Sequence, residues 1–469
     1  MYAWPSTLQT QGRIDVIEHV ELREGLYRDS VTLMLLSKVL SEDPKIFQPI
    51  VAMATTLNIE LAQSAGYEVP EGSNTDLLIA FRTDEDSPHR CLQLVEKLLN
   101  EPLGLVETRE GADRTATSLG RTIKDYGAEV ALISVPGEHA AYQAVEAIEA
   151  GAHPLIFSDN VSIESELNLK KLAEPLGLIV MGPDCGTVIL DGVGLGFANV
   201  TAVGPIGLVS ASGTGAQQVL ALCDQAAVGV RHVLGLGGRD LTDDIGGISA
   251  LTALGILDED PAIEVIGLIA KQIGPVTQKS LEGVISNMTT PVVQIPTEDL
   301  TSGTARLLTA ARSELPELPV WKPTRARQKR TGRLVGLFSG GTLALESQRI
   351  AEAAGWEAEI VDLGADEFTI GRPHPMIDNT LRLERLDEVA KDNSVGAVLI
   401  DVVLGHGASA DPATELESAI RKIQAPVFVS LIGTRNDPQD RDKQANAFAQ
   451  AGAEVFLSNA NATRAAVIQ

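Results

Sequence analysis

Short runs of Val, Ile and Leu that end in glycine-rich turns recur along the chain, and this feature constrains its fold most strongly. Ile206–Val209 runs into Ser210–Gly215, Leu334–Phe338 into a Ser-Gly-Gly-Thr turn, and Val395–Leu404 into a Gly-His-Gly turn. Buried strands of parallel sheets have this pattern, because crossover helices cover both of their faces. The sequence therefore predicts a multidomain α/β fold built from doubly wound units.

The domain organisation follows from the length and from changes in this rhythm. The 469 residues suffice for about three domains of roughly 150 residues. We expect a small α/β module over 1–112, half of a Rossmann-like sheet over 113–203 and a flavodoxin-like domain over 204–315. A Pro-rich linker over 316–332 precedes a second flavodoxin-like domain over 333–469. The last two domains look like copies of one module, since each opens with a strand, a Ser/Gly-rich turn and a helix.

The charge of the chain excludes several classes of partner. It carries 37 basic and 63 acidic side chains, a formal net charge of −26. Such a field repels polyanions, which argues against nucleic acid and acidic membranes as partners. The linker is the exception, with Arg325, Arg327, Lys329 and Arg330. This cluster is either a nucleic-acid patch or, as we expect, a solvated segment that docks on acidic neighbours.

The sequence also predicts a cytoplasmic location. No apolar run follows a basic start, and no apolar stretch approaches the roughly 20 residues that span a bilayer. Cys91, Cys185 and Cys223 are too few and too scattered for a disulfide framework or a thiolate metal site. The acidic residues show no metal-ligand spacing, so no metal is expected. Cys185 lies in a Gly-Pro turn with no histidine nearby in sequence, and we interpret it as structural.

The turn Ser210–Gly215 is the first candidate site. It follows a strand and opens a helix, whose first amide N–H groups have no helical partners and attract anions. Gly213 lets the backbone approach a ligand, while Ser210, Ser212 and Thr214 add hydroxyl groups. We therefore predict a phosphate site here. The alternative is a tight turn capped by Ser212 alone.

Two histidine-containing loops are further candidates. His406 lies between Gly405 and Gly407 after a buried strand, and an accessible imidazole there can move a proton or carry a phosphoryl group. The loop Gly371–Asp378 contains two prolines and presents Arg372, His374 and Asp378 together, and an arginine suits a planar carboxylate or phosphate. The alternatives are a histidine that only caps a helix, and a structural loop with an internal Arg–Asp pair.

Taken together, these segments resemble a known family. Met181–Thr187, Ser210–Thr214 and Gly235–Asp240 resemble, in order and spacing, the α subunit of succinyl-CoA synthetase. The block from Leu334 to the end resembles the C-terminal domain of the β subunit of that enzyme. The fusion is similar to the FdrA family, on the strings Asp366–Thr369, Gly371–Asp378, Asp401–Gly407 and Gly433–Gln439.

The resemblance implies a fold and an activity. The fold would be a Rossmann-like CoA-binding-type domain and two flavodoxin-like synthetase-type domains behind the N-terminal module. FdrA-like proteins are linked to allantoin breakdown as a component of oxamate carbamoyltransferase, in which phosphate splits a ureido acid into oxamate and carbamoyl phosphate. Partner subunits take part, and homo-oligomer formation stays open.

The departures from the synthetase bear on its cofactors. Ser158, Asp159 and Asn160 fall where the family contacts the nucleotide part of CoA, but residues 1–130 lack the Gly-x-x-Gly-x-x-Gly string that opens the CoA site. The phosphohistidine is replaced by a Pro296–Asp299 stretch without histidine. No ATP-grasp segment or Walker-type loop is present, so the sequence predicts no ATP site, while CoA binding at Ser158, Asp159 and Asn160 stays open.

A lost nucleotide site beside a retained phosphate cradle fits phosphorolysis, which needs an anion held in line and donors for the developing oxyanion. The resemblance implies that helices starting near Gly213 and Ala408 face each other, with His406 at the junction and with Gly407 and Ala408 among the anion-binding residues. Two other functions stay open. One is an acyl-CoA synthetase-like subunit that recruits a separate ATP-grasp chain, and the other is a non-catalytic CoA- or anion-binding scaffold. A neighbouring carbamate kinase gene would favour the carbamoyltransferase, and a neighbouring ATP-grasp gene would favour the acyl-CoA synthetase-like subunit.

Overall fold

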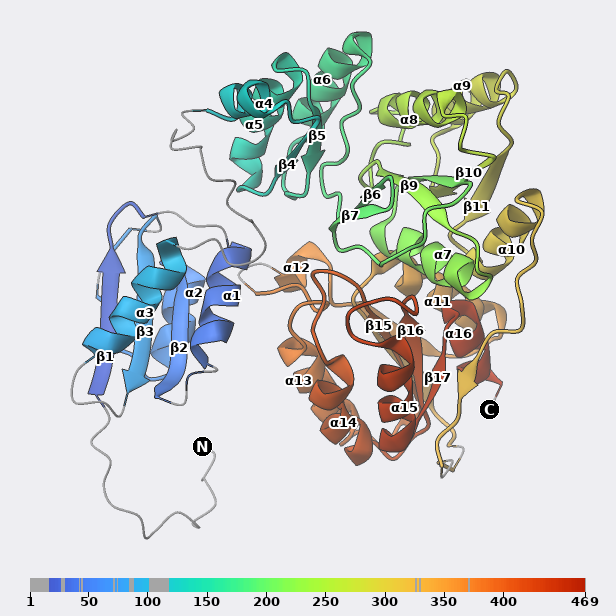
Figure 1. Cartoon of the computed structure of the whole chain (residues 1–469). Coiled ribbons are helices and arrows are strands. Elements are labelled where there is room, and N and C mark those ends of the chain that lie inside the picture. The colour runs from blue at the N-terminus through green and yellow to red at the C-terminus, as the bar shows by residue number, and fades with distance from the viewer. Residues whose placement is uncertain are drawn as a thin grey trace. The chain divides into compact units, whose positions relative to one another are not determined.

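The computed structural model describes residues 17–26, 30–41, 43, 45–70, 72–73, 75–83, 88–100, 118–324, 327–328, 330–369 and 372–468. The chain forms two compact units, Met1–Thr115 and Ala116–Gln469. Figure 1 draws the first unit in blue and the second from cyan to red. In the described residues, no helix is both long and apolar enough to cross a membrane.

The first unit is a three-stranded antiparallel sheet with helices on both faces. Its elements are β1 (Ile17–Arg23), α1 (Ser30–Ser41), β2 (Ile46–Met53), α2 (Thr56–Ser64), β3 (Leu77–Thr83) and α3 (His89–Asn100), and the strand order is β1-β3-β2. Side chains of β3 alternate between the faces. Leu77, Ile79 and Phe81 pack with α1 and α3, while Leu78 and Ala80 pack on the side of α2. The unit thus alternates three strands with three helices around an antiparallel sheet.

The second unit opens with a small parallel sheet. Its elements are α4 (Leu119–Tyr126), β4 (Val130–Ile133), α5 (Gly137–Glu149), β5 (His153–Ile156), α6 (Ile163–Ala173) and the 3-10 helix η1 (Glu174–Leu176). Strands β4 and β5 pair in parallel, and Met181 adds one parallel bridge to Leu155.

The second sheet of this unit, called the second sheet from here on, contains the Ser210 turn. Its elements are β6 (Thr187–Leu190), β7 (Val193–Gly196), β8 (Ile206–Ser210), α7 (Gly213–Gln225), β9 (Val230–Gly235), α8 (Ile248–Glu259), β10 (Val265–Ala270), α9 (Pro275–Ile285), β11 (Val292–Pro296) and α10 (Leu300–Ala310). The strand order is β11-β10-β8-β9-β6-β7. The expected boundary between residues 203 and 204 therefore falls after two strands, β6 and β7, that the structure places in this sheet.

The third sheet contains both candidate histidine loops. Its elements are β12 (Val320–Trp321), β13 (Arg333–Phe338), α11 (Gly341–Ala353), β14 (Ala358–Asp362), α12 (Asp366–Thr369), α13 (Thr380–Val389), β15 (Val395–Val403), α14 (Pro412–Lys422), β16 (Val427–Ile432), α15 (Arg441–Ala451), β17 (Ala453–Phe456) and α16 (Asn459–Val467). The order is β12-β17-β16-β15-β13-β14. Part of the expected linker is thus an edge strand, β12, which pairs antiparallel with β17. Arg327 docks on the backbone carbonyls of Ile420 and Ala451, whereas acidic neighbours were expected.

The second and third sheets wind in the same way. In each sheet the first parallel strand (β8 or β13) lies between the second (β9 or β14) and the third (β10 or β15). The fourth strand (β11 or β16) lies beyond the third. This is the flavodoxin-like order, in which ligands bind at the carboxyl ends of the first and third strands. One hydrophobic core runs through both domains, from Ile189 to Val467. The predicted doubly wound α/β architecture is confirmed.

Candidate anion site between two helix N-termini

The start of α7 carries free amide groups behind a serine cap. Ser212 Oγ accepts a hydrogen bond from Gly215 N at 2.9 Å, and Ser210 Oγ donates to Ser212 O at 2.7 Å. All three hydroxyl-bearing residues of the turn, Ser210, Ser212 and Thr214, are buried. The amides of Gly213 and Thr214 donate to no described residue, so they stay available to a ligand.

The start of α11 faces the start of α7. Ser212 Oγ and Thr342 Oγ1 are 2.6 Å apart, and a Cβ built on Gly340 would lie 2.5 Å from Thr214 Cγ2. Gly340 caps α11 without a side chain, and the amides of Gly341, Thr342 and Leu343 have no acceptor in the described part of the chain. Five free amide groups, at two positive helix ends, therefore border one junction.

The expectation that the opposing helix starts near Ala408 is wrong. Helix α14 begins at Pro412, behind an Asp411 cap, and the helix that meets α7 is α11. The turns before α11 and α14 both follow strands of the third sheet. Only α11 follows the first parallel strand of its sheet, β13, just as α7 follows the first parallel strand of the second sheet, β8. Gly407 and Ala408 instead belong to the loop between β15 and α14.

Charged groups surround the junction. A Cβ built on Gly341 would lie 2.7 Å from Asp362 Oδ2 and 3.8 Å from Lys271 Nζ. Burial raises the pKa of Asp362, while its hydrogen bond from Gly364 N and the charge of Lys271 oppose the rise. Burial also raises the pKa of Asp184 to about 6, and Asp366 adds to the rise, while Lys271 opposes it. The Asp184 residue is nevertheless exposed to solvent.

Phe197 connects the two domains beside this junction. Its carbonyl accepts from Thr187 Oγ1 at 2.8 Å, and that hydroxyl would lie 3.1 Å from a Cβ built on Gly213. The Phe197 ring lies 5.7 Å from the ring of His374, centroid to centroid. His374 thus comes from the third sheet to the edge of the anion turn.

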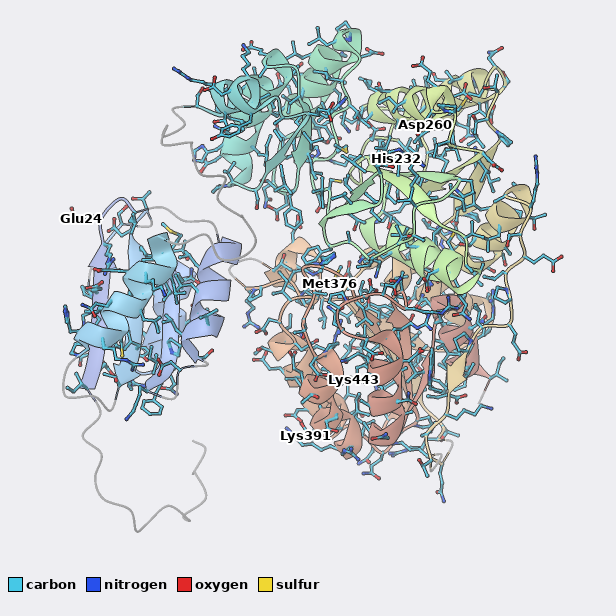
Figure 2. All side chains as sticks on the ribbon, in the orientation of Figure 1. Glu24, His232, Asp260, Met376, Lys391 and Lys443 are labelled. Carbon is cyan, nitrogen blue, oxygen red and sulfur yellow. The ribbon has the colours of Figure 1, made fainter. Side chains whose placement is uncertain are left out.

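His374 is a neutral hydrogen-bond donor in this environment. Its Nδ1 accepts from Met376 N at 3.2 Å, which leaves the proton of the neutral ring on Nε2. Burial, together with the charge of Arg382, lowers the pKa of His374 to about 4. Nε2 lies beside Gly364, 2.7 Å from a Cβ built there, and donates to no residue that the structure describes. Figure 2 labels Met376 where the second and third sheets meet.

His406 lies in the same region but is exposed. Its backbone N donates to Ala198 O at 2.8 Å, which bridges the third sheet to the segment after β7. A Cβ built on Gly407 would lie 2.9 Å from the Phe197 ring. Gln439 fixes this loop through Gly405 and Ser409. The structure therefore brings His406, Gly407 and His374 together around Phe197.

Arg372 does not join this group. Its guanidinium pairs with Glu384 at 3.6 Å on the surface, and Asp378 caps Thr380 N at 2.7 Å. The two side chains of the predicted loop thus have separate partners. Gly371 lies outside the described residues.

Ser158, Asp159 and Asn160, the residues at the CoA-type positions, mainly hold the backbone of the fold in place. Ser158 is buried, and its Oγ accepts from Val135 N at 3.0 Å. A Cβ built on Gly137 would lie 2.2 Å from Asp159 O and 2.6 Å from Asn160 C, so the loop covers the start of α5. Cys185 is also buried, and burial raises the pKa of its thiol to about 12, which suits a structural residue.

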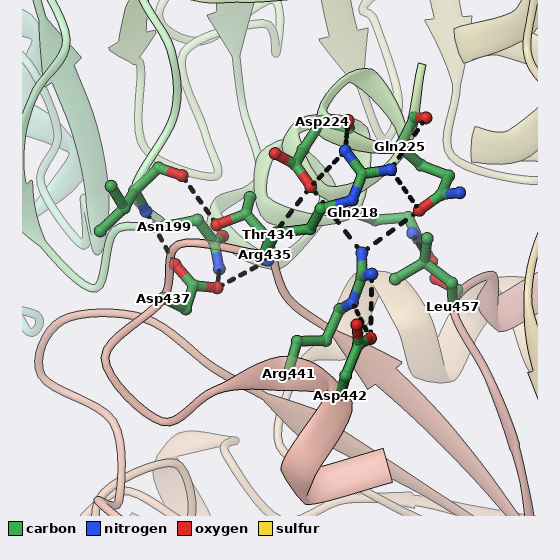
Figure 3. A network of polar contacts seen from close by, with 11 residues as sticks. Asn199, Gln218, Asp224, Gln225, Thr434, Arg435, Asp437, Arg441, Asp442 and Leu457 are labelled. Atoms are coloured by element: carbon green, nitrogen blue, oxygen red, sulfur yellow. Dashed lines mark hydrogen bonds and ion pairs between the residues drawn. The ribbon is translucent and has the colours of Figure 1, made fainter. Parts of the chain in front are cut away.

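A polar clamp holds the second and third sheets together (Figure 3). Asp437 accepts from Asn199 Nδ2 at 2.7 Å, from Val200 N at 2.8 Å and from Thr434 N at 2.7 Å. Arg435 donates to the backbone and side chain of Asp224 at the end of α7. The string Gly433–Gln439 therefore fixes α7 relative to the third sheet.

Comparisons with known proteins relate parts of the second unit to CoA ligases. Residues 337–468 match the family model described as CoA-ligase. The α subunit of the ADP-forming succinate–CoA ligase of Methanothermobacter thermautotrophicus is 26% identical over 297 residues, 62% of this chain and 91% of that subunit. A solved structure of dinucleotide-forming acetyl-coenzyme A synthetase 1 from Candidatus Korarchaeum cryptofilum covers 72% of this chain and 82% of its own, at 17% identity and a TM-score of 0.29.

The strand order of the sheets and the family match over residues 337–468 define the fold class, that of multidomain α/β proteins with a CoA-ligase-type domain. The protein YahF of Escherichia coli (strain K12) is 33% identical over 499 residues, covering 94% of this chain and 96% of YahF. The chain belongs to the YahF family.

Residues 16–114 match the model described as AllF, heavy metal-associated domain. The first unit does not fit a thiolate metal site. Its sequence contains one cysteine, Cys91, whose thiol is buried and lies 3.6 Å from Thr83 Oγ1. The described residues contain no group of three His, Cys, Asp or Glu side chains placed for a metal ion.

Several residues at the junction were missed by the sequence analysis. They are Lys271, Asp184, Asp362, Thr342 and Phe197. The available signal was positional, because Lys271 follows the third parallel strand of its sheet as His406 does, and ligands collect at that edge. For Phe197 no sequence signal existed.

Proposed function

We propose that the chain is a subunit of an FdrA-type carbamoyltransferase that binds phosphate between the N-termini of α7 and α11. It would interconvert a ureido acid of the oxalurate type plus phosphate with oxamate plus carbamoyl phosphate. The observation that carries the proposal is the junction itself, where five free amide groups and Lys271 border a site with no nucleotide-binding loop in the sequence.

The reaction makes modest demands on the protein. A phosphate oxygen attacks the ureido carbonyl carbon, the bond from that carbon to the oxamate nitrogen breaks, and the nitrogen takes up a proton. Free amides hold the phosphate in line, and Nε2–H of neutral His374 can donate to the oxyanion that develops on the carbonyl. His406 would supply the proton to the leaving nitrogen.

The comparisons support a protein that works with partners. The relative from Methanothermobacter thermautotrophicus is named as an α subunit, and the chain combines an AllF-type with a CoA-ligase-type region. We infer that partner subunits complete the enzyme, as the FdrA resemblance implies.

The direct test is carbamoyl transfer in reverse. The purified chain, with and without co-purified neighbouring subunits, is incubated with carbamoyl phosphate and oxamate. We expect oxalurate and inorganic phosphate in equal amounts, only when the chain is present. Breakdown of carbamoyl phosphate that does not depend on oxamate would contradict the proposal.

His406→Asn tests the proton donor. Asn can still cap or hydrogen-bond but cannot transfer the proton, so we expect turnover to fall by roughly 10²-fold, with phosphate affinity changed much less. The measurement is kcat against the Kd for phosphate in the assembled complex. Near-normal turnover would reduce His406 to a turn residue and leave His374 as the better candidate.

A second candidate function rests on the succinate–CoA ligase relative. An acyl-CoA synthetase-like subunit would recruit a separate ATP-grasp chain, and it would need CoA in the reaction. We expect no binding of Mg-ATP to the purified chain, because its sequence has no phosphate loop. Micromolar binding in a calorimetric titration would favour this function instead. A non-catalytic scaffold would show ligand binding but no turnover with any partner.

A further inference from the structure

Glu346 is a carboxyl group buried where the domains of the second and third sheets meet. It is 0% exposed and lies on α11, which packs against α7 and α16 (Figure 1). Helix α10 also packs against α7 and α16. Helices α7 and α10 belong to the domain of the second sheet, and α11 and α16 belong to that of the third. The reaction proposed above makes no use of this group.

One chain of hydrogen bonds joins these four helices through Glu346. Its Oε1 accepts from Leu300 N at the start of α10, at 2.8 Å. Its Oε2 accepts from Asn459 Nδ2 at the start of α16, also at 2.8 Å. Asn459 N in turn donates to Oε1 of Gln218 on α7 at 2.9 Å, and Figure 3 labels Gln218. Of these four residues only Glu346 ionises, so its protonation state acts on both domains.

In the described part of the chain, no cation pairs with the Glu346 carboxyl. The charged groups that face it are Asp299, which caps α10, and Arg464 of α16, and these two pair with each other at 2.7 Å. Arg349, almost one turn further along α11, pairs with Glu298. An ionised carboxylate at this place therefore loses its hydration without gaining a counter-ion.

The acceptors around Glu346 outnumber the donors. Asn459 Oδ1 is buried and accepts from no described residue. Asn459 Nδ2 has two further acceptors, Leu343 O at 3.0 Å and Ser347 Oγ at 3.1 Å, so it keeps partners when Glu346 Oε2 carries a proton. That proton adds a donor to the cluster. Burial raises the pKa of Glu346 to about 7, while the hydrogen bonds from Asn459 and Leu300 oppose the rise.

We propose that Glu346 is a proton switch in the contact between the two domains: below neutral pH it carries a proton while the domains are docked, and it loses the proton to water when the contact opens. The inference does not depend on the proposed reaction. In the opened chain the carboxyl is hydrated, and its pKa returns towards its ordinary value of 4.5. Docking therefore takes up one proton. The stabilisation is fully present below that value and is lost as the pH rises to about 7.

Urea denaturation of the full chain at pH values from about 5 to 8 tests the inference. Fluorescence of Trp356, which packs on the core shared by both domains, reports on the contact. One proton changes the folded-to-unfolded ratio by up to about tenfold per pH unit in this window. Because glutamine cannot ionise, we expect the midpoint of Glu346→Gln, relative to the wild type, to rise with pH and to level off above about pH 7. Glu352→Gln, at an exposed glutamate on α11, is the matched control and should follow the pH dependence of the wild type.

Glu346→Met is a second variant for the case that glutamine disturbs the hydrogen bonds. Methionine cannot ionise either, so its midpoint relative to the wild type should rise with pH in the same way, whatever its absolute stability. A midpoint difference that stays constant from about pH 5 to 8 would overturn the inference. A difference that falls as the pH rises would overturn it too, because Glu346 would then be a stabilising carboxylate. The carbamoyl-transfer assay decides the proposed function separately.

Discussion

Asp401→Ala is expected to lower the free energy of unfolding of the second unit by about 3–5 kcal/mol, the cost of leaving a buried charge without its partner. Asp401 and Arg382 are both buried, and Arg382 Nη2 donates to Asp401 Oδ1 at 2.9 Å. The same carboxylate accepts from Ser339 N at 2.8 Å, directly before α11. Truncation therefore also loosens the start of α11.

The measurement is chemical denaturation followed by circular dichroism. Asp387→Ala is the matched control in the same domain, since Asp387 on α13 forms an exposed ion pair with Lys422 at 3.0 Å, and such pairs contribute about 0–1 kcal/mol. Asp401→Ala within about 1 kcal/mol of the wild type would contradict the role assigned to this pair.

His374→Phe is expected to lower turnover by roughly 10²–10³-fold, the loss typical of removing one oxyanion donor. Phenylalanine keeps a ring against Phe197 and removes the Nε2–H donor, so phosphate affinity should change little. His232→Gln is the control, because His232 pairs with Asp260 at 3.3 Å in the second sheet. Figure 2 labels both residues well away from Met376.

The pH dependence of turnover and of stability gives a second test of the protonation state of His374. Because its pKa in the folded chain is about 4, the ring stays neutral at neutral pH and its titration should not appear in the rate there. The unfolded chain protonates this histidine near pH 6.5, so the folded state loses stability as the pH falls from about 6.5 towards 4. His374→Phe should remove that part of the loss, and an unchanged pH profile of stability would show that the ring is not held neutral.

Position in the fold explains what the sequence analysis could find. Ser210–Thr214 and His406 were found because each follows an apolar run, and ligands bind at the carboxyl ends of such strands. The assignment of the opposing helix to Ala408 was wrong because two Gly-rich turns follow strands of the third sheet. Only the strand order shows that Gly341 follows the first parallel strand and Ala408 the third.

Other features depended on contacts between distant segments. In the sequence, Lys271 resembles a solvated surface lysine. Its place at the junction is evident only from the structure, in which it lies beside Gly341. Asp437 contacts Asn199 across 238 residues of sequence, a pairing that no local pattern encodes. Burial of His374 likewise depends on Phe197, from another sheet.

A crystal structure of the full chain in inorganic phosphate tests the central claim most directly. We predict a phosphate between α7 and α11, with oxygens about 2.7–3.2 Å from amides of the Gly213 and Gly341 turns and from Lys271 Nζ. A junction without phosphate, in which these amides are bonded to protein groups instead, would contradict the account.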